Sequence, residues 1–385
     1  SGGAARLERL TDDDHDDHDD WTQNRAGFRS DWKAGAHDRV TFMGDVYDGE
    51  NLDRVALAIL STTPGASPRT FDDRVKVEGG NFVTRWEHDT LSVQAFYDYT
   101  DRQSEAFSDT IHTFDLDFQH RFSPFDGHDL LWGAGYRVTR TDTEGSYPFN
   151  VNPELRRDDV VSAFIQNEFV LFDDSLRLTA GSKFEHNDYS GFEAQPSARL
   201  SWSPHERHQV WLAASRAVRT PSIIDHDGKL TPIIISGGLP IVFSVFGQRD
   251  FQTEELLSYE LGYRIRPAEA LTLDLAFFTN IYDHLRSGEV GGFIVETSPT
   301  PVHLVIPVNL ENNLNAKTYG AELASNLQIA PWWLLQANAS YLRVNLDPST
   351  DEGRDPRFQT WIRSAQNLPG NLTFDVMARY VSRLP

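Results

Sequence analysis

The residues whose types and spacing could bind a metal ion stand near the start of the chain, in the run Thr11–Trp21, TDDDHDDHDDW. His15 and His18 lie among aspartates, and imidazole and carboxylate groups are common ligands of divalent cations. A run of like charge is also typical of a solvated surface segment, which attracts cations only loosely. We therefore predict an acidic, outward-facing loop segment over residues 1–21, with His15 and His18 as weak metal candidates.

Two arginines in the segment Ser215–Ser222, SRAVRTPS, could bind an anion. If this segment is a strand, the spacing of Arg216 and Arg219 directs their side chains to opposite faces. One of them can then serve an interior or an anionic ligand, while the other meets the rim. The alternative is structural pairing of both arginines with the many carboxylates of the chain, whose formal net charge is -22.

An apolar segment, 231–247, offers a second kind of contact surface. Gly237, Gly238 and Pro240 interrupt it, so it cannot form a membrane-spanning helix, and two β-rich arms around Gly-Gly predict a hairpin. This hairpin could contact a ligand or pack on neighbouring loops, and the sequence leaves both open. The candidate ligand-contact residues are Arg216, Arg219, His226, Phe243, Phe246, Tyr189 and Phe293.

Signatures of enzymes and of nucleic-acid binding are missing from the 385 residues. The sequence contains no G-x-S-x-G, H-E-x-x-H, P-loop or dinucleotide fingerprint, so we predict no enzyme and no cofactor. Cysteine is absent, which removes disulfides and thiol nucleophiles. The acidic balance argues against nucleic acid as a partner, because phosphate binding requires clustered lysine and arginine.

The elements that must position these residues are strands. Segment 271–283, LTLDLAFFTNIYD, alternates apolar with mostly smaller or polar side chains, and this two-residue period recurs in roughly sixteen segments. One face of the strands carries charges of both signs, where a soluble sandwich would need an apolar core. The residues predicted to form this inner wall are Asp115, Asp117, Glu168, Lys183, Glu185, Glu260, Arg264, Asp274, Glu322 and Arg379.

The connections between these segments tend to alternate between short and long, as they do in outer-membrane barrels. Five tryptophans stand beside the short turns, where an interfacial aromatic girdle belongs: Trp32, Trp86, Trp202, Trp332 and Trp333. We therefore predict a partial β-barrel domain over residues 22–385. Its long outward loops are expected near 48–79, 141–157, 220–253, 286–314 and 346–357.

Two motifs go beyond pattern. SRAVRTPS, which ends the stretch Lys183–Ser222, and YELGYR, Tyr259–Arg264, resemble barrel strands of TonB-dependent outer-membrane receptors, and the likeness continues from about Asp19 to the end. The resemblance implies an all-β, antiparallel transmembrane barrel of about 22 strands that holds a plug. Here we expect an incomplete barrel of about 16 strands, without plug or last strands, and with two unpaired edges.

The resemblance also implies a function: energy-coupled uptake of a scarce nutrient, with ferric siderophore as the default ligand. The expected partners are outer-membrane lipid, the ligand, and the TonB complex through a plug domain that this chain lacks. The expected location is the outer membrane of a Gram-negative bacterium. The alternatives are a passive porin-like channel and, less favoured, a soluble β-rich binding protein.

Overall fold

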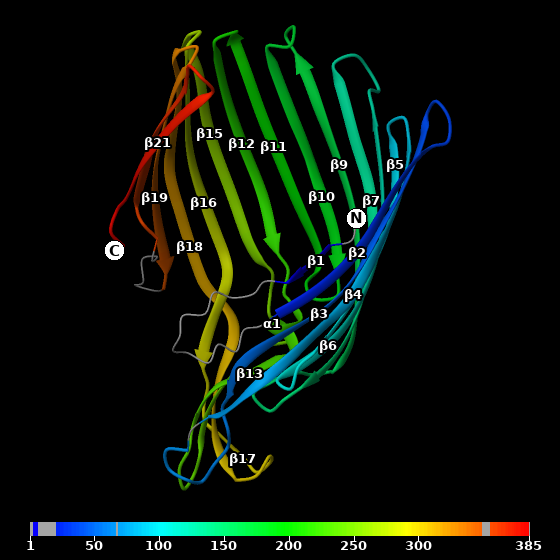
Figure 1. Cartoon of the computed structure of the whole chain (residues 1–385), viewed down its shortest axis with the longest axis vertical. Helices are drawn as coiled ribbons and strands as arrows, with labels where there is room; N and C mark the ends of the chain where they lie inside the picture. Colours follow the sequence, from blue (N-terminus) through cyan, green and yellow to red (C-terminus); the bar gives the residue numbers. More distant parts are fainter. Residues whose placement is uncertain (1–2, 7–20, 67, 349–354, 385) are drawn as a thin grey trace.

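Sixteen strands of at least ten residues dominate the computed structural model, which describes residues 3–6, 21–66, 68–348 and 355–384 (Figure 1). The alternation of apolar and polar side chains along these segments suits a pleated sheet that separates two environments. They are β2 (Trp21–Lys33), β3 (Asp38–Leu57), β4 (Arg69–His88), β5 (Leu91–Gln103), β6 (Phe107–Phe122), β7 (His128–Gly145), β9 (Leu155–Leu171), β10 (Leu176–Asn187), β11 (Gly191–His205), β12 (His208–Arg219), β15 (Glu254–Ala268), β16 (Leu271–Val290), β18 (His303–Ala330), β19 (Trp333–Asp347), β20 (Phe358–Leu368) and β21 (Leu372–Val381).

Six shorter elements complete the described part of the chain. They are β1 (Gly3–Arg6), β8 (Phe149–Val151), α1 (Ile223–Asp227), β13 (Gly228–Ile235), β14 (Ile241–Phe246) and β17 (Ile294–Glu296). Strand β1 falls within the range predicted as an acidic loop segment and pairs with β2, whose outer edge would otherwise carry unpaired backbone groups.

The long strands form one antiparallel sheet in which each strand pairs with the next along the chain. The pairs β12–β15 and β16–β18 continue this order across the inserted short elements. Among the described residues, β21 pairs only with β20 and β1 only with β2, so the curved sheet does not close (Figure 1). The prediction of an all-β, antiparallel and incomplete barrel is confirmed.

Strand register places the ten predicted wall residues on one face, which we call the polar face. Asp274 pairs with Arg264, for example, and their side chains form an ion pair. Asp115 pairs with Arg137, whose Nε lies 2.7 Å from the Asp115 carboxylate. On this face, charges of both signs can stay hydrated without an apolar core.

The opposite, apolar face is exposed. Leu212, Leu261 and Phe277 lie side by side on β12, β15 and β16, and they are 47%, 42% and 46% exposed. Soluble proteins rarely leave an apolar surface that extends over many strands in contact with water. The apolar side chains therefore do not meet across a sandwich, and the face has the character of a lipid-facing surface.

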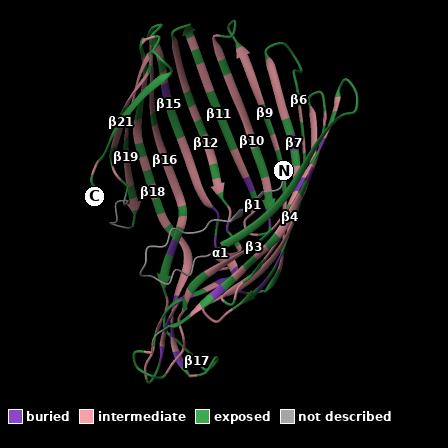
Figure 2. Ribbon diagram, viewed as in Figure 1, coloured by how far each residue is buried: buried purple, intermediate pink, exposed green. Residues whose placement is uncertain are grey.

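Buried residues are concentrated at the end of the sheet that carries α1 and β13 (Figure 2). Within the described residues, the buried hydrophobic side chains are Val83, Val151, Val242, Phe251 and Val305, and all except Val83 belong to this end. We call this end, comprising the connections 146–154, 220–253 and 291–302 with the strand ends that adjoin them, the outer lobe. A packed interior exists there and not along the wall.

Strand pairing extends into two of the ranges that the sequence predicts as long loops. β3 and β4 pair from Asp38–His88 out to Leu57–Arg69, so strand pairing occupies much of the range 48–79. Likewise, β16 and β18 extend into 286–314. Pairing continues because neighbouring strands still satisfy each other's backbone groups beyond the apolar band. The connections themselves are correspondingly shorter than the predicted loops.

The tryptophans beside the short turns are partly exposed. Trp32, Trp86, Trp202 and Trp332 are 59%, 41%, 49% and 47% exposed, as residues of an interfacial girdle would be in the absence of lipid. Across the described residues, no helix has the length and apolar character needed to cross a membrane.

Candidate functional site

Helix α1 is the element that organises the outer lobe. It lies in the connection between β12 and β15, and it begins at Ser222, whose hydroxyl accepts a hydrogen bond from the backbone N–H of Asp225. The Asp225 carboxylate in turn accepts from the Ser222 backbone N–H at 3.0 Å, which completes a capping box. This Ser-x-x-Asp signal is visible in the sequence, although the range 220–253 is predicted above as a long loop with no helix.

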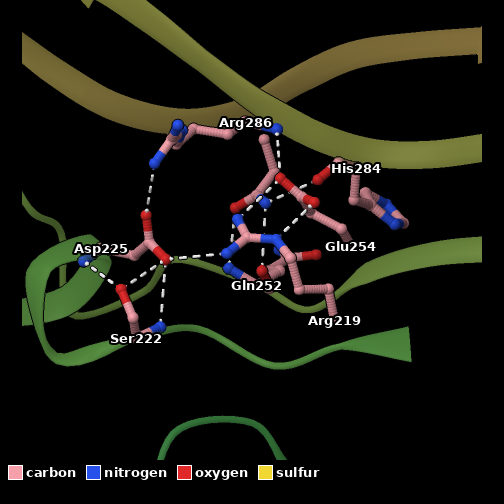
Figure 3. Close-up of polar contacts among 8 residues, drawn as sticks. Arg219, Ser222, Asp225, Gln252, Glu254, His284 and Arg286 are labelled. Atoms are coloured by element: carbon pink, nitrogen blue, oxygen red, sulfur yellow. Dashed lines mark hydrogen bonds and ion pairs between the residues drawn. The ribbon is translucent and has the colours of Figure 1, made fainter.

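Asp225 links two long strands, β12 and β16. Its side chain is 1% exposed and lies 3.2 Å from Arg219 Nη1, at the end of β12, and 3.1 Å from Arg286 Nη1, on β16 (Figure 3). Arg219 also donates two hydrogen bonds to Glu254, at the start of β15, at 2.7 and 2.9 Å. We call Arg219, Asp225, Glu254 and Arg286 the arginine–carboxylate cluster.

The cluster is balanced in charge, with two guanidinium groups and two carboxylates. Burial alone would raise the pKa of Asp225, but hydrogen bonds from Ser222 and Arg286 and the charge of Arg219 hold that pKa below its usual value. The hydrogen bonds from Arg219 lower the pKa of Glu254, against the opposing effect of burial. Arg219 is therefore neutralised by structural partners, which is the alternative that the sequence left open for it.

The other buried carboxylate of α1 faces a second group of side chains. Asp227, also 1% exposed, forms an ion pair with Arg156 of β9, and its Oδ1 lies 3.1 Å from His226 Nδ1 and 3.5 Å from Arg249 Nε. Arg156 is held further by Asp158, at 2.6 Å. Helix α1 thus connects three long strands, β9, β12 and β16, through two carboxylates two residues apart.

Two of the predicted ligand-contact residues come together here. The rings of Tyr189 and His226 meet edge to face at 5.5 Å, and the Arg156 guanidinium lies 4.2 Å from the Tyr189 ring centroid. Burial and the nearby Asp158 charge raise the pKa of Tyr189, so its hydroxyl stays protonated and donates to Asp158 at 3.0 Å. These side chains form an aromatic and cationic surface in which Asp158 and Asp227 neutralise the charge of Arg156.

A cavity of about 630 Å³ opens beside α1. Phe246 forms part of its lining, and Lys229 lies 5.4 Å above the Phe246 ring. The lining holds both charges, amides and an aromatic ring, which suits noncovalent binding of a polar ligand with an aromatic part. The lining residues are Asn150, Asn152, His226, Asp227, Gly228, Lys229, Phe246, Gly247, Gln248, Arg249 and Asp250.

The structure does not bring the remaining candidates to this cavity. Arg216 forms a separate cluster, with Glu193 at 3.1 Å and Glu255 at 2.9 Å. Phe243 lies within β14, and Phe293 is 72% exposed between β16 and β17. His15 and His18 lie outside the described residues, which contain no group of three or more potential metal ligands placed to hold an ion.

The predicted hairpin forms, and it also packs on neighbouring segments. β13 and β14 pair antiparallel from Lys229–Phe246 to Ile235–Ile241, while β14 pairs in parallel with β18. Beside this junction, fully buried His303 lies 2.9 Å from the Tyr147 hydroxyl. Burial and the charge of Glu296 raise the pKa of Tyr147 to about 12. The parallel pairing has no signal in the sequence, since the two strands lie far apart along the chain.

Comparison with known proteins adds an independent finding. The family model for the β-barrel of TonB-dependent receptors matches residues 3–383. No curated protein matches the chain in sequence.

Solved structures share the fold at low identity. The siderophore receptor PirA from Pseudomonas aeruginosa is 14% identical with a TM-score of 0.70, over 94% of this chain and 63% of that one. The ferric enterobactin receptor PfeA from Pseudomonas aeruginosa, in complex with BCV-L6, is 14% identical with a TM-score of 0.74, over 94% and 58%. The alcaligin outer-membrane receptor FauA from Bordetella pertussis is 16% identical with a TM-score of 0.58, over 94% and 61%. The chain thus spans less than two thirds of the length of these receptors.

Proposed function

Because this chain belongs to the TonB-dependent receptor family, as its β-barrel part, we propose that it forms the wall and outward loops of an uptake receptor. The receptor imports a scarce nutrient across the outer membrane of a Gram-negative bacterium. The energy comes from the TonB complex, which acts through the plug domain of the receptor. The protein acts as a transporter and not as an enzyme.

The observation that carries this proposal is the division of one sheet into two faces. The apolar face exposes Leu212, Leu261 and Phe277 in register, whereas the polar face carries paired charges such as Arg264 and Asp274. A barrel that separates lipid from a hydrated interior needs this division. The polar face can then line a water-filled conduit or contact a plug, and the outer lobe can supply selectivity.

Ferric siderophore is the ligand class that we propose. The structural neighbours are described as siderophore receptors, and one PfeA structure is a complex with enterobactin. In this chain, the cavity beside α1 offers His226, Phe246 and Lys229 for contact with a polar aromatic chelate. The Tyr189 ring packs edge to face against the His226 ring. Arg216 and Arg219 pair with carboxylates of neighbouring strands, and Phe243 and Phe293 lie outside the lining of this cavity.

Uptake of a radiolabelled iron chelate tests the proposal in cells that produce the full receptor. We expect accumulation that stops when the proton gradient is dissipated, because the transport step draws energy through TonB. Accumulation that continues unchanged without the gradient would identify a passive channel instead. If no ferric chelate binds at micromolar concentration, this ligand class is rejected. The receptor would then import a different scarce nutrient.

A pair of cavity substitutions sharpens the test. His226→Ala with Phe246→Ala should weaken chelate binding by about tenfold or more, since each removes a ring from the lining. Phe125→Ala is the matched control, because Phe125 is 74% exposed in the short β6–β7 turn at the other rim. Equal affinity in both variants would move the ligand site away from this cavity.

A further inference from the structure

Cationic side chains lie at the outer limit of the apolar face on the neighbouring strands β6, β7 and β9, and Figure 1 shows where these strands lie in the sheet. Register pairs His112 of β6 with Arg140 of β7, and Arg140 with Arg157 of β9. Arg140 and Arg157 are exposed. We call His112, Arg140 and Arg157 the basic row.

The basic row begins where the apolar band ends. On β7, the positions on this face from the short turn outward are Leu130, Trp132, Ala134, Tyr136 and Val138, and Arg140 follows. That run has about the length of strand that crosses a bilayer, about 9–11 residues. On β6, Phe114 and Leu116, 41% and 42% exposed, precede His112 in the same way. The row therefore lies at the level of the headgroups.

Two arginines directly opposite each other on an antiparallel pair repel. Within the described residues, Arg140 has no ion-pair or hydrogen-bond partner, whereas Arg157 donates two hydrogen bonds to Asp159, at 2.9 and 3.0 Å. This arrangement contrasts with Arg219 and Arg286, which share buried carboxylates. In the part of the chain that the structure describes, no carboxylate therefore bridges the guanidinium groups of Arg140 and Arg157.

Aromatic groups flank the row. The Tyr99 ring contacts the His112 ring in a tilted arrangement, with centroids 5.0 Å apart, and Tyr97 Oη lies 2.9 Å from His112 Nδ1. Arg157 Nη2 donates to Tyr136 Oη at 3.3 Å. Tyrosine is enriched at the boundary between lipid and water, where its ring contacts acyl chains and its hydroxyl contacts headgroups. The surroundings of the row thus suit a lipid better than a water-soluble ion.

We propose that Arg140 and Arg157 bind the phosphate group of an outer-leaflet lipid, with His112 and the flanking tyrosines in contact with the rest of the headgroup. The phosphate oxygens accept hydrogen bonds from both guanidinium groups and remove their mutual repulsion. The acyl chains continue over Phe114, Leu116 and Val138 on the apolar face. The inference rests on the membrane placement in the proposed function, not on the imported ligand.

The test measures lipid retained by the full receptor purified in detergent. The probes are a phosphorylated lipid A, the same lipid without phosphate, and inorganic phosphate. The wild type should retain the phosphorylated lipid. Arg140→Gln with Arg157→Gln should lower its affinity roughly 25-fold, since each cation near an anionic lipid surface is worth about a fivefold factor.

Two further variants keep the result interpretable. Arg207→Gln with Arg266→Gln removes two exposed cations near the short β11–β12 and β15–β16 turns, at the other rim, and should retain the lipid as the wild type does. Arg140→Lys with Arg157→Lys keeps both charges and should retain most of the affinity, which separates charge from folding.

Three results would overturn the proposal. They are unchanged retention in the double glutamine variant, equal binding of the phosphate-free lipid, and tight binding of inorganic phosphate alone. The last result would indicate a free-anion site. Lipid retention is measured without transport, so a receptor that imports no iron chelate can still pass this test, and failure here leaves the uptake proposal standing.

Discussion

The wall of the sheet and its outer lobe use ion pairs in opposite surroundings. On the wall, Arg363 and Asp375 form an ion pair while 43% and 44% exposed. In the lobe, Asp225 forms ion pairs with Arg219 and Arg286 while 1% exposed. An exposed pair gains little because water already solvates both charges, whereas a buried charge without its partner is very unfavourable. Ion pairs on the wall therefore stay hydrated, whereas ion pairs in the outer lobe fix the positions of α1 and the strands that it contacts.

The difference in burial shows how the chain combines a hydrated interior with a defined outer surface. Along the wall, continuous backbone pairing joins neighbouring strands, and the side chains face lipid or water with exposed ion pairs between them. In the lobe, β13 and β14 add strand pairs of their own, and the buried carboxylates of α1 add cross-links between the long strands. Four predictions test this contrast.

Asp225→Asn should give the largest effect. It removes the charge shared by Arg219 and Arg286 in a buried position, and loss of one partner of a buried pair costs on the order of 3–5 kcal/mol. Hydrogen exchange should show faster exchange of the backbone amides in 220–253. Asp375→Asn on the wall is the matched control, and equal effects of the two substitutions would contradict the contrast.

Leu261→Arg should come next, because it places a cation on the apolar face near the middle of the sheet. A charged side chain at the bilayer midplane costs about 2–4 kcal/mol in a transmembrane barrel. The fraction of receptor that folds into lipid vesicles, measured against urea, should fall accordingly. Glu260→Arg, its neighbour on the polar face, should fold nearly as the wild type. If Glu260→Arg folds less well than Leu261→Arg, the lipid-facing side of the sheet has been assigned to the wrong face.

Acid should loosen the lobe before the wall. Folding lowers the pKa values of Asp225 and Glu254 from 3.8 and 4.5, so the cluster stabilises the lobe above these values. That stabilisation is lost as pH falls below them and through the lower folded values. Protease cleavage within 220–253 should increase below about pH 4. In Asp225→Asn this increase should be smaller, and an unchanged increase would exclude the cluster as its cause.

Ser222→Ala should give the smallest effect. It deletes the hydroxyl that caps α1, which typically costs about 1 kcal/mol. Hydrogen exchange at the Asp225 amide should rise, while Ser222→Thr keeps the cap and should leave it near the wild-type rate. A loss as large as that of Asp225→Asn would mean that the cap, and not the ion pairs, holds the helix.

Much of the wall could be predicted from sequence because a strand's face is a local property. Asp274 and Leu275 alternate, so they face opposite sides whatever strands lie beside them. The short turns and the tryptophans beside them are equally local. The ends of the strands were more difficult to predict. Pairing of β3 with β4 extends to Leu57–Arg69, and the length of this pairing depends on both strands and not on one segment alone.

The candidate site was only partly predictable. Tyr189, His226 and Phe246 were expected near a ligand, and the structure places them around α1 and its cavity, where their contact with a ligand stays a prediction. Asp225, Glu254 and Arg286 were missed. The Ser-x-x-Asp capping signal could have identified Asp225, but no pattern indicates that Arg286 lies beside it.

The sequence by itself determined which side of each strand is apolar, where the short turns fall and that the family's barrel motifs are present. Only the tertiary structure decided which carboxylate neutralises which arginine. Asp225 and Arg286 are 61 residues apart, and β14 reaches β18 in parallel across the intervening strands. The two-residue period determines which face each side chain of a strand occupies. The partner of a charged side chain, in contrast, depends on the register and arrangement of all the strands in the sheet.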